Sequence, residues 1–328
     1  MRSPSVASFV MLVGLAGLIG CDNAGVELGV PEAETYTVIA DVFLDRDGSR
    51  NRSALDTSYT GARVALLHKG SGDTLRAVAT DNQGLSKFEN VPQGEYRVAV
   101  AQGGLGDTVE VAEIDTPTLM IRRGDDTTVV VVRLGYPEFT VRQARAAAPG
   151  KPVFLRGVIL AGVQSFRDTT SHLSDSSGTI RLTEVTLRGG LAGNAPGDSV
   201  SVLGVTSSRM GQPTLDRAIV SRFGGRPAPL PAIVSTAIAA SADAGKLDAG
   251  LVQVISAEII DTVTVMPDLH VTVDDGTGQL VVVLDANIQF PRNAFIPTRR
   301  MTVRGVLVPA NGGTWTLKPR DLGDVTLF

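Results

Sequence analysis

Residues 137–328 contain two copies of one pattern, and this duplication constrains the fold more than any other feature of the chain. Each copy has an Ala-rich start, a hairpin and a later apolar strand. The matching blocks lie at 140–148 and 234–244, at 173–180 and 273–280, and at 198–205 and 300–306. Because repeated sequences form repeated structural units, both copies are predicted to adopt the same architecture.

Within each copy, the sequence predicts a short helix followed by five strands. Thr140 and Gln143 have the spacing of a capping box, which predicts that a helix begins there. Short runs of Val, Ile and Leu between Gly and Asp turns predict the strands. Gly157, Gly204 and Gly305 lie where we expect a barrel strand to bend sharply. Five strands that close on themselves would form a small barrel.

The segments 156–160 and 175–181 resemble bacterial OB domains of the nucleic-acid-binding superfamily. The resemblance implies two OB-like five-stranded β-barrels, one over 137–225 and one over 233–328. A linker rich in Pro and Gly, at 226–232, separates them.

Residues 36–136 alternate apolar runs with Gly, Asp and Asn turns, which predicts a β-sandwich. Within this part, 80–84 with Phe88, and 91–98 with Tyr96, resemble the prealbumin-like carboxypeptidase regulatory-like domains and the B repeats of bacterial adhesins. The resemblance implies a prealbumin/Ig-like sandwich with Phe88 and Tyr96 in its core. Members of these families have structural or binding roles more often than catalytic ones. The whole chain is therefore predicted to be all-β.

In the adhesin repeats the first strand leads into a calcium loop, and the corresponding loop here carries oxygen ligands around a Gly turn. These are Asp45, Asp47, Asn51 and Asp56. Calcium takes many oxygen ligands at once, so the resemblance implies a calcium site. The loop also carries Arg46, Arg50 and Arg52, which would repel a cation. A solvated Asp-Gly hairpin with Arg counter-charges is the alternative, and no other cofactor is expected.

The N-terminus predicts export. Arg2 precedes an apolar run over 10–19, shorter than the ~20 residues of a membrane-spanning helix, and this shape is typical of a secretory signal. The run leads to Cys21, the only cysteine of the chain, and 18–21 resembles the bacterial lipobox. The resemblance implies a signal peptide over 1–20 that is cleaved before Cys21.

The lipobox also implies a fatty acid, such as palmitate, on Cys21 and a flexible tether over 21–35. The protein would then lie outside the cytoplasm, anchored by lipid to the bacterial cell envelope. Which membrane holds the anchor stays open. The alternatives are an ordinary cleaved signal peptide with an incidental cysteine, and a buried core segment.

Charge is uneven along the chain. Residues 22–136 carry 11 Lys and Arg against 18 Asp and Glu, whereas 137–225 carry 10 against 6. The middle part is not basic enough to require nucleic acid, and its second and third strands carry no aromatic side chain on which bases would stack. Nucleic acid is therefore an unfavoured partner that stays open. The candidate ligand-binding residues, for phosphate or polysaccharide, are Arg156, Arg181 and Arg188.

No set of residues has the spacing of a catalytic or zinc motif. His172 and His270 do not align between the copies, and we expect both at strand edges. Trp315 is expected in the core or at a barrel end. We therefore predict a non-enzymatic, membrane-anchored protein that binds or scaffolds a protein or a glycan. The alternatives are a nucleic-acid-binding envelope protein and an accessory subunit of an enzyme.

Overall fold

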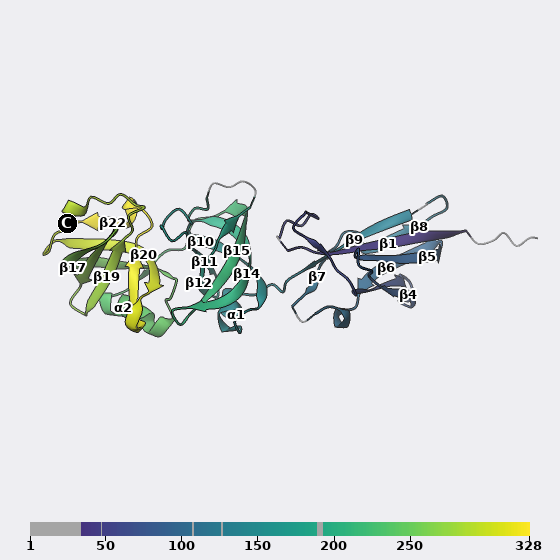
Figure 1. The fold of residues 1–328 in the computed structure, drawn as a ribbon, viewed down its shortest axis with the longest axis horizontal. Helices are drawn as coiled ribbons and strands as arrows, with labels where there is room; N and C mark the ends of the chain where they lie inside the picture. The colour runs from purple at the N-terminus through teal and green to yellow at the C-terminus, as the bar shows by residue number, and fades with distance from the viewer. Residues whose placement is uncertain (1–33, 47, 107, 126, 189–192) are drawn as a thin grey trace, which may run out of the picture. The chain divides into compact units, whose positions relative to one another are not determined.

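The computed structural model describes residues 34–46, 48–106, 108–125, 127–188 and 193–328, and these are drawn in colour in Figure 1. Strands make up about half of these residues and the helices are few and short, which confirms the all-β prediction. The predicted signal peptide and Cys21 lie outside the described residues. Within the described part, no helix has the length and apolar character needed to cross a membrane.

Two sheets that pack face to face form the first part of the chain. In the first sheet, β1 pairs with β2, β5 and β9, and β9 pairs with β7; β1 and β9 run parallel. The second sheet has the order β4-β3-β6-β8. The strands are β1 (Thr35–Leu44), β2 (Thr57–Ser58), β3 (Arg63–His68), β4 (Thr74–Ala79), β5 (Leu85–Pro92), β6 (Gly94–Val100), β7 (Glu110–Ile114), β8 (Thr118–Ile121) and β9 (Thr127–Gly135).

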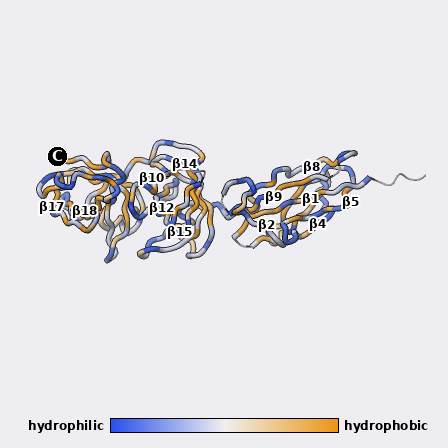
Figure 2. The backbone as a smooth tube through the Cα atoms, turned by 45° about the horizontal axis from the view of Figure 1, so that its top comes forward, coloured by the Kyte–Doolittle hydropathy of each residue, from blue (hydrophilic) through white to orange (hydrophobic). Residues whose placement is uncertain are grey.

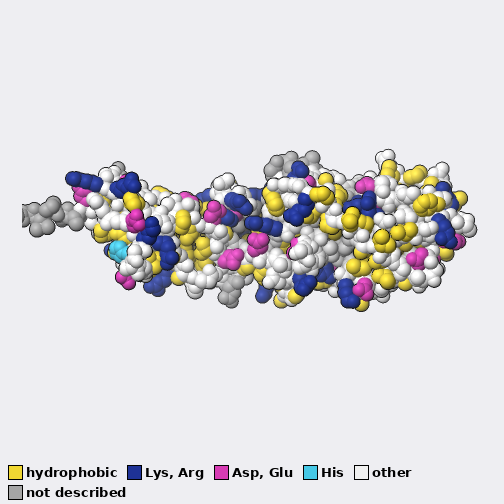
Figure 3. All heavy atoms as spheres, turned by 180° about the vertical axis from the view of Figure 1, so that it is seen from behind, with side chains coloured by type: hydrophobic (Ala, Val, Ile, Leu, Met, Phe, Trp, Pro, Cys, Tyr) yellow, Lys and Arg dark blue, Asp and Glu magenta, His cyan; other side chains and the backbone are white. Residues whose placement is uncertain are grey.

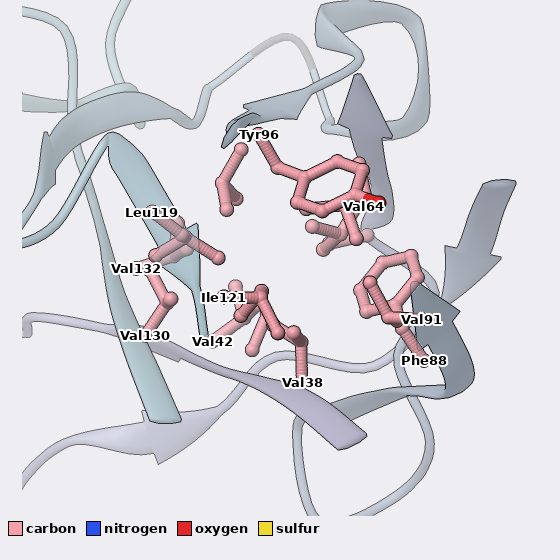
Figure 4. Close-up of a cluster of buried hydrophobic side chains, with 14 of the residues drawn as sticks. Val38, Val42, Val64, Phe88, Val91, Tyr96, Leu119, Ile121, Val130 and Val132 are labelled. Atoms are coloured by element: carbon pink, nitrogen blue, oxygen red, sulfur yellow. The ribbon is translucent and has the colours of Figure 1, made fainter. Parts of the chain in front are cut away.

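The core of this sandwich follows from alternation along the strands. In β1, Val38, Ala40 and Val42 are fully buried, because every second side chain points to the same face of a strand. Phe88 and Tyr96 lie between the sheets, as predicted, and Figure 4 shows both rings among Val and Leu side chains. The Tyr96 hydroxyl donates to the carbonyl of Pro92 at 2.9 Å, which satisfies its polar end within the core.

The next part is a closed barrel, barrel 1, that begins after the short helix α1 (Val141–Ala146). Its strands are β10 (Pro152–Ala161), β11 (Ser171–Asp175), β12 (Gly178–Leu182), β14 (Asp198–Arg209) and β15 (Gln212–Gly225). Their order is β12-β11-β10-β14-β15, and a parallel pairing of β12 with β15 closes the ring. The short strand β13 (Thr186–Leu187) runs parallel to β15 on the same edge as β12, further along the strand.

Barrel 2 repeats this order after the helix α2 (Thr236–Gly245). Its strands are β17 (Leu251–Val265), β18 (Asp268–Asp274), β19 (Gln279–Leu284), β20 (Arg300–Pro309) and β21 (Trp315–Lys318). Pairing of β17 with β20 closes the ring, and β19 runs parallel to β21. Two short strands, β16 (Ala232–Ile233) and β22 (Val325–Leu327), add to its edges. Figure 2 shows that apolar residues concentrate on the strands of both barrels.

The helices confirm both the capping box and the duplication. Thr140 and Gln143 form the reciprocal bonds of a capping box at the start of α1. The hairpin of each barrel then holds the helix before it: Asp175 accepts from the N–H of Val141 at 2.8 Å, and Asp275 accepts from the N–H of Thr236 at 3.1 Å. The aligned carboxylates therefore satisfy free N–H groups at the two helix N-termini.

The glycines at the predicted bends are required by close packing. A Cβ atom at Gly157 would lie 2.4 Å from the carbonyl oxygen of Ser174, and one at Gly305 would lie 2.3 Å from that of Lys318. At Gly204 it would lie 2.6 Å from the side chain of Leu215. These distances are shorter than any ordinary contact of a Cβ atom, so the strands can bend there only without a side chain.

Candidate functional site

The carboxylates of the predicted calcium loop bind the loop's own backbone. The oxygens of Asp45 accept from the N–H groups of Ser49 at 3.1 Å and Arg50 at 3.0 Å, and Arg133 pairs with the same carboxylate at 3.3 Å. Asp45 is almost completely buried. These bonds stabilise a turn in the chain after β1.

Asp56 has the same role on the other side of the loop. Its oxygens accept from the N–H groups of Arg46 at 2.9 Å and Ser53 at 2.6 Å. Asn51 is exposed, and Asp47 lies outside the described residues. Within the described part of the chain, no group of three or more His, Cys, Asp or Glu side chains is arranged to hold a metal ion. Calcium binding at this loop stays a prediction.

Of the three candidate arginines, the structure brings Arg156 and Arg188 together. Both line one hollow between the outer side of β10, β14 and β15 and the sandwich, whose loop at 48–50 and strand β7 form the other wall, and Arg222 lines it as well. Arg156 lies over the ring of Phe154, with 5.5 Å from its guanidinium carbon to the ring centre. The Phe223 side chain is 60% exposed at the same place. We call Phe154, Arg156, Arg188, Arg222 and Phe223 the basic-aromatic face.

Acidic residues accompany these arginines, and Asp45 of the sandwich acts electrostatically on Arg188. Arg156 lies 3.7 Å from Glu138, and Arg222 lies 2.7 Å from Asp198. The side chains of Arg156 and Arg222 are about half exposed, so these ion pairs contribute little to stability and exchange readily with a ligand. Elsewhere, as Figure 3 shows for one side of the molecule, basic and acidic side chains are interspersed.

Arg181 lies apart from this face, in the contact between the two barrels, which we call the seam. Both barrels belong to the compact unit Thr35–Phe328. An apolar cluster forms the middle of the seam and contains Leu160, Ala161 and Phe166 from barrel 1 and Leu251 and Val306 from barrel 2. All five are buried, which stabilises the contact by roughly 1 kcal/mol or more for each large side chain.

Charged side chains surround the apolar cluster of the seam. Arg320 binds Asp324 at 2.8 Å within barrel 2 and donates to the carbonyl of Leu160 in barrel 1 at 2.9 Å. Burial opposes ionisation of Asp324, but its bonds to Arg320 outweigh that effect and lower its pKa. The pair is therefore ionised at neutral pH and ties the end of β10 to barrel 2.

An ion pair crosses the seam at Lys318. Its ammonium group lies 3.1 Å from Asp285 in barrel 2 and 3.7 Å from Asp168 in barrel 1. It also lies 4.5 Å from the ring centre of Phe166, within range of a cation–π interaction. The backbone N–H of Arg167 donates to Asp285 at 3.3 Å, so this carboxylate binds both barrels.

The seam covers the outer side of β11 and β12, where His172 and Arg181 face each other across the strand pair. His172 is completely buried, so the expectation that it lies at a strand edge is wrong. Barrel 2 packs on this face of the strand, and the sequence of barrel 1 alone does not reveal that contact. Burial, together with the charge of nearby Arg181, lowers the pKa of His172 from 6.5 to about 3. The imidazole is therefore neutral at physiological pH.

Sequence reasoning identified Arg181 but missed the residues around it. Asp248, Lys318 and Arg320 belong to no motif, and they acquire a role only because the barrels pack on each other. The sequence does contain one signal of this contact. The positions that align with His172 and Arg181 in the second copy are Thr272 and Val281, so the copies differ in polarity at the same place on the fold.

Comparison with known proteins does not identify a family. No family model matches the chain, and no curated protein matches it. Among solved structures, the RrgB pilus protein of Streptococcus pneumoniae matches with 13% identity over 39% of this chain, with a TM-score of 0.26. This chain spans 28% of the length of that protein.

Two further solved structures are similar at the same level. The major pilin subunit BcpA of Bacillus cereus has 8% identity, covers 90% of this chain and 95% of its own length, and has a TM-score of 0.26. The Ifi202 HINa domain, solved with 20-base-pair double-stranded DNA, has 12% identity, covers 56% of this chain and 97% of its own length, and also has a TM-score of 0.26. Likeness at this level supports no inference about function, which must be argued from the chain's own residues.

Proposed function

We propose that this chain is a lipid-anchored protein of the bacterial cell envelope that binds an acidic glycan or an acidic protein surface without chemical turnover. The observation that carries the proposal is the basic-aromatic face of barrel 1. There, Arg156 and Arg222 lie half exposed beside Phe154 and the largely exposed Phe223. Arg and aromatic side chains are enriched in binding interfaces.

The chemistry of this face fits a polyanion. A guanidinium group donates two parallel N–H bonds to one carboxylate, which gives both strength and orientation. An exposed phenyl ring offers a flat apolar surface on which a sugar ring or an aliphatic side chain packs. In OB-type barrels the second and third strands commonly bind oligonucleotides and oligosaccharides. In barrel 1 those strands are covered at the seam, so binding at the basic-aromatic face fits the exposed surface better.

Binding is tested with three immobilised polymers: alginate as an acidic glycan, polyglutamate as an acidic polypeptide and dextran as a neutral control. We expect the mature chain to bind alginate or polyglutamate and not dextran. The variants Arg156→Gln and Phe223→Ser should each weaken binding about tenfold, because each removes one contact of about 1.4 kcal/mol. The control Arg142→Gln, an exposed arginine on α1, should bind normally.

If the chain binds neither alginate nor polyglutamate, this function is rejected. Tighter binding to single-stranded DNA, with a steep dependence on salt, would instead favour the nucleic-acid alternative. The anchor is tested separately by mass spectrometry of the protein purified from its native membrane. An N-terminal acylated Cys21 is expected, and an intact leader without fatty acid would reject the anchor while leaving the binding result valid.

A further inference from the structure

His172 and Arg181 are buried polar groups with unsatisfied hydrogen-bonding capacity. His172 is fully buried and Arg181 is 8% exposed. Neither ring nitrogen of His172, nor Nε of Arg181, has a hydrogen-bond partner among the described residues. Leaving such groups unpaired costs about 1 to 3 kcal/mol for each neutral donor or acceptor and more for a charged one. Buried groups of this kind are normally satisfied by a water molecule or an ion.

Comparison of the two copies indicates that burial alone does not explain why His and Arg occupy positions 172 and 181. The aligned positions in barrel 2, Thr272 and Val281, are partly exposed. The barrel whose face is covered therefore carries His and Arg, and the barrel whose face is more open carries Thr and Val. Burial alone favours the opposite distribution, since Val is commonly buried and Arg seldom is. A polar function for the covered pair explains the reversal.

The charges of the seam also leave Arg181 without its own carboxylate. Arg145 binds Asp248 at 3.1 Å, Lys318 binds Asp285 at 3.1 Å, and Arg320 binds Asp324 at 2.8 Å. Arg181 is attracted to Asp248, Asp168 and Asp216 only through longer-range electrostatics. An unpaired charge in a buried site carries a large desolvation penalty, which a bound counter-ion removes.

We propose that a small inorganic anion, such as chloride or phosphate, binds in the seam between the guanidinium of Arg181 and an imidazole N–H of His172. Arg181 supplies the positive charge and several N–H donors. The neutral ring of His172 supplies one donor and no second charge. Because barrel 2 covers the pair, the bound anion contacts both barrels only when they are assembled. This site is independent of the basic-aromatic face and of the ligand proposed there.

The proposal is tested by thermal unfolding of the full mature chain, followed by the fluorescence of Trp315, in gluconate buffer at constant ionic strength. A ligand that binds only the folded state raises Tm with concentration. We expect chloride or phosphate to raise Tm, and Arg181→Met to abolish the rise. Arg142→Met, at an exposed arginine on α1 of the same barrel, should retain it. No rise with either anion, or an equal rise in Arg181→Met, would overturn the proposal.

A second measurement keeps the test decisive if Arg181→Met does not fold. A crystal of the unaltered protein grown with bromide in place of chloride should show an anomalous peak within hydrogen-bond distance of Arg181. An ordered water at that place, with no anomalous signal, would show that solvent alone satisfies the pair and would refute the anion site.

Discussion

Trp315 donates its indole N–H to Asp248, with 2.8 Å between Nε1 and Oδ1. The other oxygen of the same carboxylate accepts from Arg145 of barrel 1 at 3.1 Å, and the backbone carbonyl of Asp248 accepts from the hydroxyl of Thr179 at 2.8 Å. Asp248 is almost fully buried. One residue therefore joins the core of barrel 2 to two elements of barrel 1. Because Trp315 is the only tryptophan in the chain, its fluorescence reports on the seam.

Replacement of Asp248 should strongly destabilise the barrel pair. Asp248→Ala leaves the guanidinium of Arg145 and the indole N–H of Trp315 without their partner, and removing one member of a buried ion pair costs about 3 to 5 kcal/mol. We expect a loss near 3 kcal/mol in urea unfolding followed by Trp315 fluorescence. Asp243→Ala is the control, since its pair with Lys246 is exposed and the expected loss is below about 0.5 kcal/mol. Equal stability of the two variants would contradict this role.

The bend of β10 should not tolerate a side chain. In Gly157→Ala the new Cβ atom would meet the carbonyl oxygen of Ser174, which lies in the neighbouring strand β11 and cannot move without breaking the pair. Overpacking of this kind costs about 1 to 3 kcal/mol. Gly224→Ala, in the same barrel, meets only the Cβ of Ser199 at 3.9 Å and should be neutral. A comparison of urea midpoints for the two variants measures the difference.

Much of the fold was predictable because its signals are local. The capping box of Thr140, the bend at Gly157 and the core positions of Phe88 and Tyr96 depend on neighbours in sequence or on strand alternation. The strand β7 does not follow from alternation, because its five residues include Glu110 and Glu113 and do not alternate cleanly. Its place is set instead by antiparallel pairing with β9.

The site was less predictable, because it depends on which surfaces meet. Arg156 and Arg188 are far apart in sequence, and only the pairing of β10 with β14, β14 with β15, and β15 with β13 brings them to one face. The burial of His172 depends on barrel 2, more than a hundred residues along the chain. Periodicity cannot reveal a contact of that kind, since it shows which side of a strand is apolar and not what covers the other side.

The calcium prediction is tested by comparing the Tm of the unaltered chain in calcium with its Tm in magnesium. Calcium at the Asp45 loop would raise Tm of the sandwich in millimolar calcium relative to millimolar magnesium, by mass action on the folded state. Because Trp315 lies in barrel 2, circular dichroism is the measurement. Asp56→Asn should remove the rise, although it also weakens the bond to the N–H of Ser53. An unchanged Tm at millimolar calcium would leave the solvated turn as the role of this loop.

Acid should weaken the seam through His172. Its folded pKa is about 3, against an ordinary value of 6.5, because burial disfavours the charged ring. Between these two values the unfolded chain binds a proton that the folded chain does not, so stability falls as the pH is lowered from 6.5 towards 3. Asp168, Arg181 and Lys318 are the charged groups that act on the ring. The expected slope is about 1 kcal/mol per pH unit in this range.

The variant His172→Leu should flatten that slope, because it removes the titrating group from both states. His270→Leu, at the partly exposed histidine of barrel 2, is the matched control and should keep the slope. Urea unfolding at several pH values between 4 and 7, in gluconate buffer without chloride or phosphate and followed by Trp315 fluorescence, measures both slopes. An identical slope in the unaltered chain and in His172→Leu would show that carboxylates such as Asp324, whose lowered pKa also couples stability to acid, dominate instead.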